Sequence, residues 1–111
     1  MSGYILKIDT QDNKKTSVSL EINGKSKTKE RKLDHASQNL LPLIDELLTE
    51  NKLTLKMITA IDINTGPGSY TGLRVGMAVA QTLSFFLDIP LNGKKYPSYP
   101  DLVYNHSVNK P

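Results

Sequence analysis

The stretch NTGPGSYTGLRVG, residues 64–76, holds four of the seven glycines in this 111-residue chain. It joins an apolar run with strand character, KMITAIDIN (56–64), to a segment with helical spacing of apolar residues, YTGLRVGMAVAQTLSFFL (70–87). A glycine-rich turn at the start of a helix can present backbone N–H groups to a phosphate. Glycines within a helix can instead let another element pack closely against it. Most of the functional interpretation depends on which use applies.

The phosphate alternative has the right position but not a known spacing. The glycines follow the pattern G-x-G-x-x-x-G, which differs from the dinucleotide fingerprint, and no Lys-Ser/Thr pair follows as a P-loop requires. Under this alternative the binding candidates in the turn are Gly66, Gly68 and Ser69.

The packing alternative rests on a stripe of small residues. Gly72, Gly76 and Ala80 recur at four-residue intervals and therefore share one helix face. Glycine inside a helix costs about 1 kcal/mol relative to alanine, so two in one stripe indicate close backbone approach. The element packed there is either the Leu-rich helix described below or a second chain. Another face, which we expect in the core, carries Val75, Val79, Leu83 and Phe86.

The remaining periodicity predicts an α/β domain with three strands before the first helix. Asn23-Gly24 favours a tight hairpin turn, and Asp34 or Ser37 is the expected N-cap of the Leu-rich helix. The order β-β-β-α-β-α predicts a mixed sheet with helices on one face and the lysine-rich third strand near its edge. The predicted strands cover 3–10, 16–22, 25–33 and 56–64, and the predicted helices cover 37–51 and 70–87.

The last twenty residues have little periodicity and three prolines. We expect the folded domain to cover 1–91 and a divergent, loose tail to cover 92–111. A short helix opened by Pro100 and running through Tyr104 is the alternative.

Composition excludes several classes of function. The chain has no cysteine, so disulfides and thiolate metal sites are excluded, and its two histidines, His35 and His106, are not spaced as a ligand pair. No catalytic triad or acid pair is evident, so we expect neither a catalytic residue nor a metal site. The N-terminus lacks the pattern of a signal peptide, and no stretch predicts a membrane span. We therefore expect a cytoplasmic protein.

The net charge of +3 draws on the lysine-rich stretch NGKSKTKERK (23–32). This stretch is either a solvated strand face or a contact for tRNA phosphates. We favour the solvated face, because no aromatic residues for base stacking interleave with the lysines.

Three segments together resemble one family. ILKIDT (5–10), HASQNLLPLIDELL (35–48) and GPGSYTGLRVGMAVAQTL (66–83) closely resemble the N-terminal domain of the TsaB (YeaZ) family, in matching order and spacing over roughly residues 3–91. The resemblance implies an ASKHA fold (actin-like ATPase, ribonuclease H-like). Family members are commonly longer and carry a second ASKHA-like domain, so we do not expect this chain alone to bind nucleotide.

The resemblance also implies a function. Family members are non-catalytic scaffold subunits in the synthesis of N6-threonylcarbamoyladenosine at A37 of tRNA. They pair through two helices with a TsaD-like catalytic subunit, and a TsaE-like ATPase with ATP and magnesium joins that complex. They form homodimers when alone and contact tRNA indirectly. The residues expected to bind the partner are Leu40, Ile44, Leu47, Gly72, Arg74, Gly76 and Ala80.

Alternatives remain for three features. Asp9 matches the carboxylate that ends the first strand of ASKHA proteins and can face nucleotide phosphate or magnesium, although a turn-forming role explains it equally well. If Asp9 and the 66–72 turn bind nucleotide, the alternative function of the chain is that of a nucleotide-binding domain. A further alternative function is that of a homodimeric interaction module. Arg74 is either a salt-bridge donor to a partner or a solvated side chain.

Overall fold

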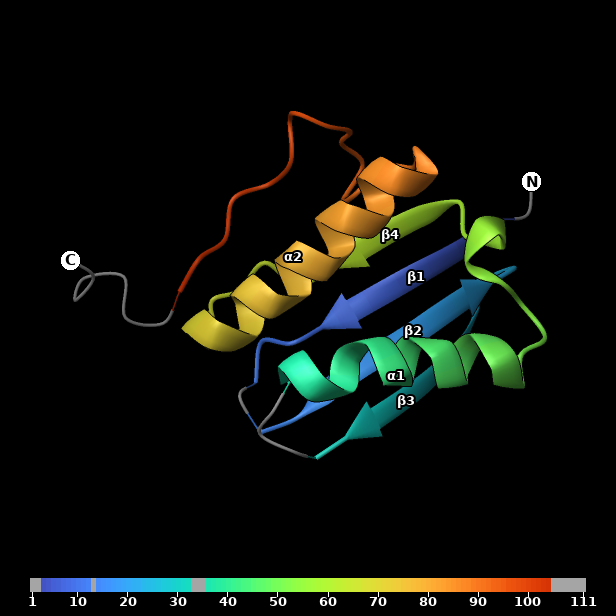
Figure 1. The fold of residues 1–111 in the computed structure, drawn as a ribbon, viewed down its shortest axis with the longest axis horizontal. Helices are drawn as coiled ribbons and strands as arrows, with labels where there is room; N and C mark the ends of the chain where they lie inside the picture. Colours follow the sequence, from blue (N-terminus) through green and yellow to red (C-terminus); the bar gives the residue numbers. More distant parts are fainter. Residues whose placement is uncertain (1–2, 13, 33–35, 105–111) are drawn as a thin grey trace.

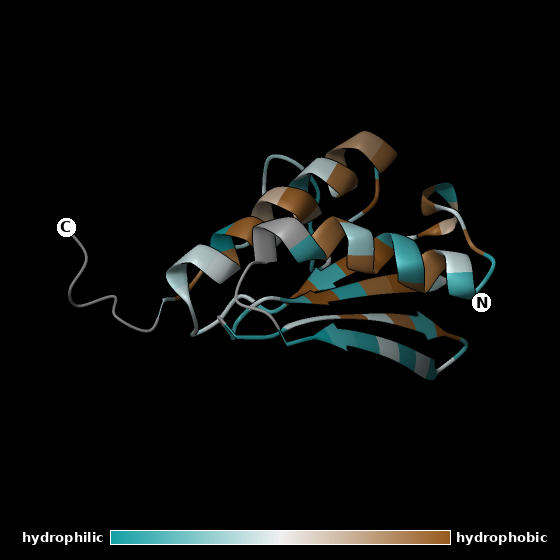
Figure 2. Ribbon diagram, turned by 60° about the horizontal axis from the view of Figure 1, so that its bottom comes forward, coloured by the Kyte–Doolittle hydropathy of each residue, from teal (hydrophilic) through white to brown (hydrophobic). Residues whose placement is uncertain are grey.

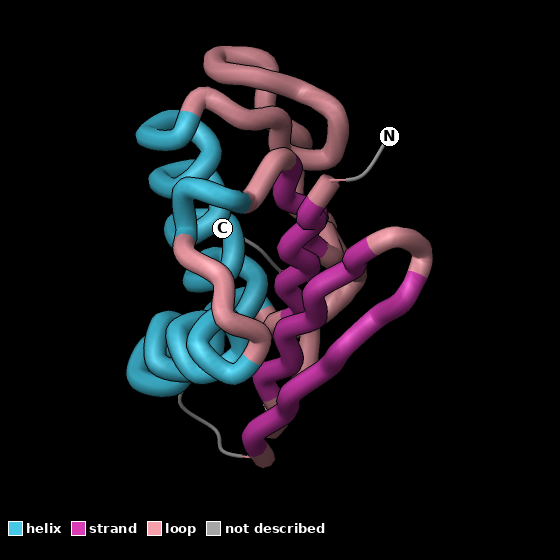
Figure 3. The backbone as a smooth tube through the Cα atoms, turned by 90° about the vertical axis from the view of Figure 1, so that its right-hand side faces the viewer, coloured by secondary structure: helices cyan, strands magenta, loops and turns pink. Residues whose placement is uncertain are grey.

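The chain folds into a mixed sheet with two helices on one face. A computed structural model describes residues 3–12, 14–32 and 36–104. The strand order is β3-β2-β1-β4, with β1 parallel to β4 and the other pairs antiparallel. Both helices lie on the same side of the sheet (Figure 1, Figure 3). The elements are β1 Tyr4–Asp9, β2 Thr16–Ile22, β3 Lys25–Arg31, α1 Ala36–Glu50, the 3₁₀ helix η1 Leu55–Met57, β4 Ala60–Ile63 and α2 Tyr70–Leu87.

This architecture confirms the predicted α/β class and the edge position of β3. The β2–β3 turn has the left-handed backbone that Asn and Gly favour, with φ of 53° at Asn23 and 80° at Gly24. Helix α2 has the bounds that the sequence predicted.

The core lies between the sheet and the helices. Alternate residues of the two central strands face the helices, so Leu6 is paired with Leu20 and Ile8 with Val18, all nearly inaccessible to solvent. Helix α1 packs over β2 and β3 and against α2. Figure 2 shows hydrophobic stretches alternating with hydrophilic ones along both helices, as expected for helices with one buried face.

Two predicted boundaries near helix α1 and strand β4 were wrong. Ser37 lies inside α1, which begins at Ala36, so it is not the N-cap; the other candidate, Asp34, lies outside the described residues. Strand β4 starts at Ala60, because residues 55–57 form a 3₁₀ turn in which the Ile58 N–H bonds the Leu55 carbonyl.

The described part of the segment after α2, residues 88–104, packs against the domain, and the rest of the expected loose tail lies outside the described residues. Leu91 is fully buried, and Tyr99 and Leu102 pack against the core. Residues 100–104 contain no helix, because tertiary contacts hold them extended: the Val103 N–H donates to the Thr65 carbonyl at 2.8 Å. No helix in the described part of the chain is long and apolar enough to cross a bilayer.

Candidate functional site: the start of helix α2 and its outer face

The glycine-rich turn is fastened to the end of strand β1. The Ser69 N–H donates to the Gln11 carbonyl at 2.9 Å, and a side chain at Gly68 would overlap Gln11. Ser69 is also the N-cap of α2, because its Oγ accepts the Gly72 N–H at 3.1 Å. One of the N–H groups that an anion would need at this helix end is therefore already bonded within the chain.

The small-residue stripe of α2 packs against Thr10. A Cβ on Gly72 would overlap the Thr10 carbonyl oxygen, and a Cβ on Gly76 would overlap Thr10 Oγ1. Ala80, the third member of the stripe, is fully buried. Close backbone approach is therefore the use of these glycines, as the packing alternative predicted. The stripe packs on Thr10, the residue that follows β1. The sequence had suggested that the Leu-rich helix or a second chain packs there.

The predicted partner-contact residues of α1 are in the core. Leu40, Ile44 and Leu47 are each no more than 2% exposed, because this face of α1 lies over the sheet. With the buried stripe of α2, six of the seven predicted residues point inward, and only Arg74 is exposed. Their role in partner binding stays a prediction, but the side chains themselves are used inside the chain.

The face of α2 that the sequence assigned to the core is partly solvent-exposed. Phe86 is 82% exposed, whereas Val75, Val79 and Leu83 are partly buried and pack against the core, as the sequence predicted for them. These residues and the exposed Ala78 lie at helical spacing around the outer side of α2. We call Val75, Ala78, Val79 and Phe86 the outer face. A signal was present in the sequence, since α2 contains a single charged residue, Arg74, and most surface helices carry several.

Arg74 lies beside this face and makes an aromatic contact. Its guanidinium carbon is 5.3 Å from the centre of the Tyr70 ring, within the range of a cation–π interaction. The Tyr70 ring in turn packs on Tyr104 with centroids 4.7 Å apart. No salt bridge to Arg74 occurs among the described residues, so its charge is available at the surface.

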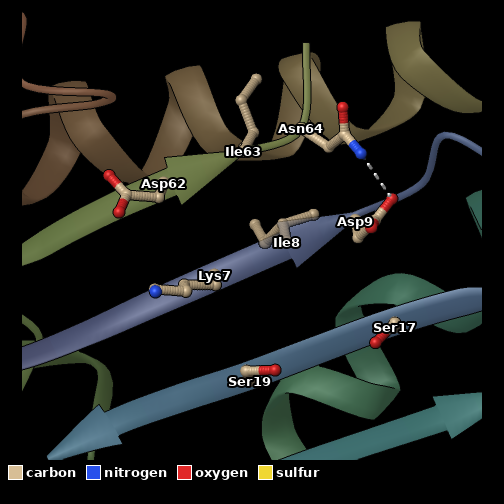
Figure 4. A pocket seen from close by; sticks show the side chains of 8 residues that line it. All are labelled: Lys7, Ile8, Asp9, Ser17, Ser19, Asp62, Ile63 and Asn64. Atoms are coloured by element: carbon tan, nitrogen blue, oxygen red, sulfur yellow. Dashed lines mark hydrogen bonds between the residues drawn. The ribbon is translucent and has the colours of Figure 1, made fainter. Parts of the chain in front are cut away.

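The nucleotide candidate Asp9 is bonded within its own turn. Asp9 Oδ1 accepts from the Gln11 N–H at 3.1 Å and from Asn64 Nδ2 at 3.4 Å, the second bond being drawn in Figure 4. Asn64 also donates to Gln11 Oε1 and accepts the Gly66 N–H. Asn64, which sequence reasoning passed over as a ligand, thus joins the end of β1 to the glycine-rich turn.

A shallow pocket of about 340 Å³ opens beside Asp9 on the sheet face without helices (Figure 4). Its wall contains Lys7, whose ammonium lies 2.9 Å from Glu21; the hydrogen bond to Glu21 and then its charge raise the pKa of Lys7. Of the four predicted nucleotide residues only Asp9 lines this pocket. No group of three potential metal ligands occurs among the described side chains. The lining residues are Lys7, Ile8, Asp9, Ser17, Ser19, Asp62, Ile63 and Asn64.

The lysine-rich strand β3 is partly neutralised by α1. Lys29 lies 2.7 Å from Glu50, whose hydrogen bond raises the pKa of Lys29, and Arg31 lies 2.7 Å from Glu46. Two of the cations that would bind tRNA phosphates are therefore paired, which agrees with the solvated-face interpretation.

Known proteins resemble the chain in both sequence and structure. The family model described as TsaD, tRNA N6-adenosine threonylcarbamoyltransferase, matches residues 30–93. The protein named tRNA threonylcarbamoyladenosine biosynthesis protein TsaB from Buchnera aphidicola is 36% identical over 84% of this chain and 44% of its own length. Its namesake from Haemophilus influenzae is 44% identical over 50% of this chain and 23% of its own length. The solved structure of YeaZ from Pseudomonas aeruginosa superposes with a TM-score of 0.76 and 32% identity, over 80% of this chain and 42% of that one.

The mixed sheet, the two helices on one face and these similarities define an ASKHA-type protein of the threonylcarbamoyltransferase family. Within that class the chain belongs to the TsaB (YeaZ) family. The chain spans less than half the length of the curated relatives it matches.

Proposed function

We propose that this chain is a non-catalytic subunit in the synthesis of N6-threonylcarbamoyladenosine on tRNA, working in the cytoplasm. It pairs with a TsaD-like catalytic subunit through its helical layer, and a TsaE-like ATPase joins that complex. ATP and magnesium bind only in the complex, and the chain forms homodimers when alone. Membership of the TsaB family and the names of its relatives support the pathway.

The observation that carries the pairing is the outer face of α2. Covering an exposed apolar side chain such as Phe86 with another protein surface removes it from water, which lowers the free energy of the complex. Phe86, Val79 and Val75 lie along one side of a helix that has no acidic residue and one cation, so a second apolar helix can pack there without stranding a charge. Leu41 of α1 adds a further exposed apolar side chain to the same layer, 56% exposed.

The experiment uses Ala78, because it is exposed in the chain and a change there leaves the core untouched. We expect Ala78→Arg to fold normally and to lose co-elution with a TsaD homologue in gel filtration. Ser26→Arg, which introduces the same side chain on exposed β3, is the matched control and should keep the complex. Co-elution of Ala78→Arg at the level of the parent chain would refute the proposed surface.

Nucleotide binding is the second candidate, favoured by the pocket beside Asp9. The pocket presents Asp9 and Asp62 with one paired lysine, which is a poor environment for triphosphate unless magnesium neutralises it. Calorimetric titration with Mg-ATP separates the two candidates: heat that disappears in Asp9→Asn supports nucleotide binding by the chain alone. Absence of heat at millimolar nucleotide removes that candidate and leaves the pairing proposal unaffected.

A further inference from the structure

Strand β4 is the edge of the sheet next to the C-terminal segment. In a strand of a parallel pair, the backbone N–H and C=O groups of alternate residues point to opposite sides of the strand. The groups of Ile61 and Ile63 therefore point away from β1. Unpaired groups at such an edge form a template for another strand. Strand β4 carries one charged residue, Asp62, whereas β3 at the other edge carries four cations.

Residues 90–92 pair with the first half of this edge. The Ile61 N–H donates to the Pro90 carbonyl at 2.9 Å, and the Asn92 N–H donates to the Ile61 carbonyl at 2.8 Å. These bonds begin a fifth strand parallel to β4, in which Leu91 is the one residue of the described segment 88–104 that forms a bridge to β4.

The chain then turns away before it reaches Ile63. Asn92 and Gly93 have φ of 49° and 78°, and Leu91 and Lys94 exchange two backbone hydrogen bonds of 2.8 and 2.9 Å. This is the geometry of a tight turn with two left-handed residues, which Asn-Gly favours. The backbone of residues 93 and 94 therefore leaves the edge.

The side chain of Asn92 takes the place of the missing strand residue. Its Oδ1 accepts the Ile63 N–H at 2.7 Å, and its Nδ2 donates to the Ile63 carbonyl at 3.2 Å. An amide side chain offers the same acceptor and donor as a peptide group, so it satisfies both orphan groups of Ile63. Beyond it, Val103 bonds the Thr65 carbonyl and extends the cover along the edge.

We propose that Asn92 closes the β4 edge against a second copy of this chain. Residues 90–92 and Val103 cover the edge on either side, so without this amide the outward N–H and C=O of Ile63 would be the one gap in the cover, open to backbone groups of a second copy. The closed edge leaves the helical layer as the apolar surface open to a partner.

The test removes the amide and keeps the turn. Asn92→Gly retains the left-handed turn, and Asn92→Asp retains the Oδ1 acceptor but has an oxygen in place of the Nδ2 donor to the Ile63 carbonyl. Asn23→Gly is the matched control, since Asn23 occupies the same turn position, with φ of 53°, between β2 and β3. All variants are made in the full chain carrying Ala78→Arg, so that association through the helical layer does not contribute.

We expect amide exchange at Ile63 to be about tenfold faster in Asn92→Gly, from the loss of the bond to its N–H, and near the parent rate in Asn23→Gly. Asn92→Asp should lie between them, because it keeps that bond and loses the one to the Ile63 carbonyl. Sedimentation at rising concentration should show dimers of Asn92→Gly only. An unchanged exchange rate at Ile63 would overturn the proposal, as would faster exchange in a chain that stays monomeric. If Asn92→Gly does not fold, exchange at Ile63 in Asn92→Asp at the parent rate would overturn the proposal, because that variant lacks the donor to the Ile63 carbonyl.

Discussion

Gly76 and Thr10 are so close that a methyl group on the glycine Cα would overlap the threonine Oγ1. Thr10 is 2% exposed and follows strand β1, so the contact fixes how near α2 lies to the sheet. This pair explains a helix that tolerates two internal glycines, because the loss of helix propensity is offset by packing that no larger residue permits.

Gly76→Ala should therefore destabilise the chain despite the better helix propensity of alanine. Overpacking costs about 1–3 kcal/mol, which exceeds the gain of about 1 kcal/mol over most of that range. Thr10→Ala removes the overlapping atom, so the double variant should recover at least about 1 kcal/mol relative to the sum of the single changes. Urea denaturation of the four proteins gives this coupling. Additive effects, or a stabilised Gly76→Ala, would contradict the packing role.

Tyr99 tests whether the segment after α2 is part of the fold. Its hydroxyl donates to the buried Ser84 Oγ at 3.0 Å, and Ser84 donates to the Ile89 carbonyl. Tyr99→Phe should lower the free energy of unfolding by about 0.5–1.5 kcal/mol. Tyr96→Phe is the control, since Tyr96 is 65% exposed. Equal stability of Tyr99→Phe and the parent chain would show that the hydrogen bond from Tyr99 to Ser84 contributes little.

The Lys7–Glu21 pair predicts a pH dependence at alkaline pH. Glu21 raises the pKa of Lys7 above 10.5, so the stabilisation is fully present below the unfolded pKa and disappears as pH rises through the folded pKa. Both side chains are about a third or more exposed, so the effect is small. The Tm difference between the parent and Glu21→Gln should be constant from neutral pH to about pH 10 and shrink above it. A difference that persists at the alkaline end would mean that Glu21 acts through another contact.

The sequence predicted the sheet, both helices and the Asn23 turn, because these depend on local periodicity and turn chemistry. It left open what packs on the glycine stripe of α2, and of the four residues it assigned to the core, Phe86 is exposed and Val75, Val79 and Leu83 are partly buried. A glycine stripe and a valine stripe are both apolar, and only the position of Thr10 in space decides which one lies inward. The role of Asn92 could not be predicted either, because an Asn-Gly pair predicts a turn but not a bond to Ile63, twenty-nine residues away.

The contacts of the nucleotide candidates likewise depend on tertiary structure that local sequence does not specify. The sequence offered Asp9 as a nucleotide ligand or a turn former; its bond to the Gln11 N–H is that of a turn, and its role toward nucleotide stays a prediction. The bonds of Asn64 to Asp9 and Gln11 were not predicted, because they depend on β1 and β4 being neighbours in the sheet.

The affinity of the chain for a TsaD homologue, measured by calorimetry on the parent, Ala78→Arg and Ser26→Arg, tests the central claim most directly. We expect Ala78→Arg to raise the Kd by at least about tenfold, because a long cation enters the apolar contact. This factor corresponds to about 1.4 kcal/mol of binding free energy. Ser26→Arg should bind like the parent. Equal Kd values for all three proteins, or loss confined to Ser26→Arg, would contradict pairing through the outer face of α2.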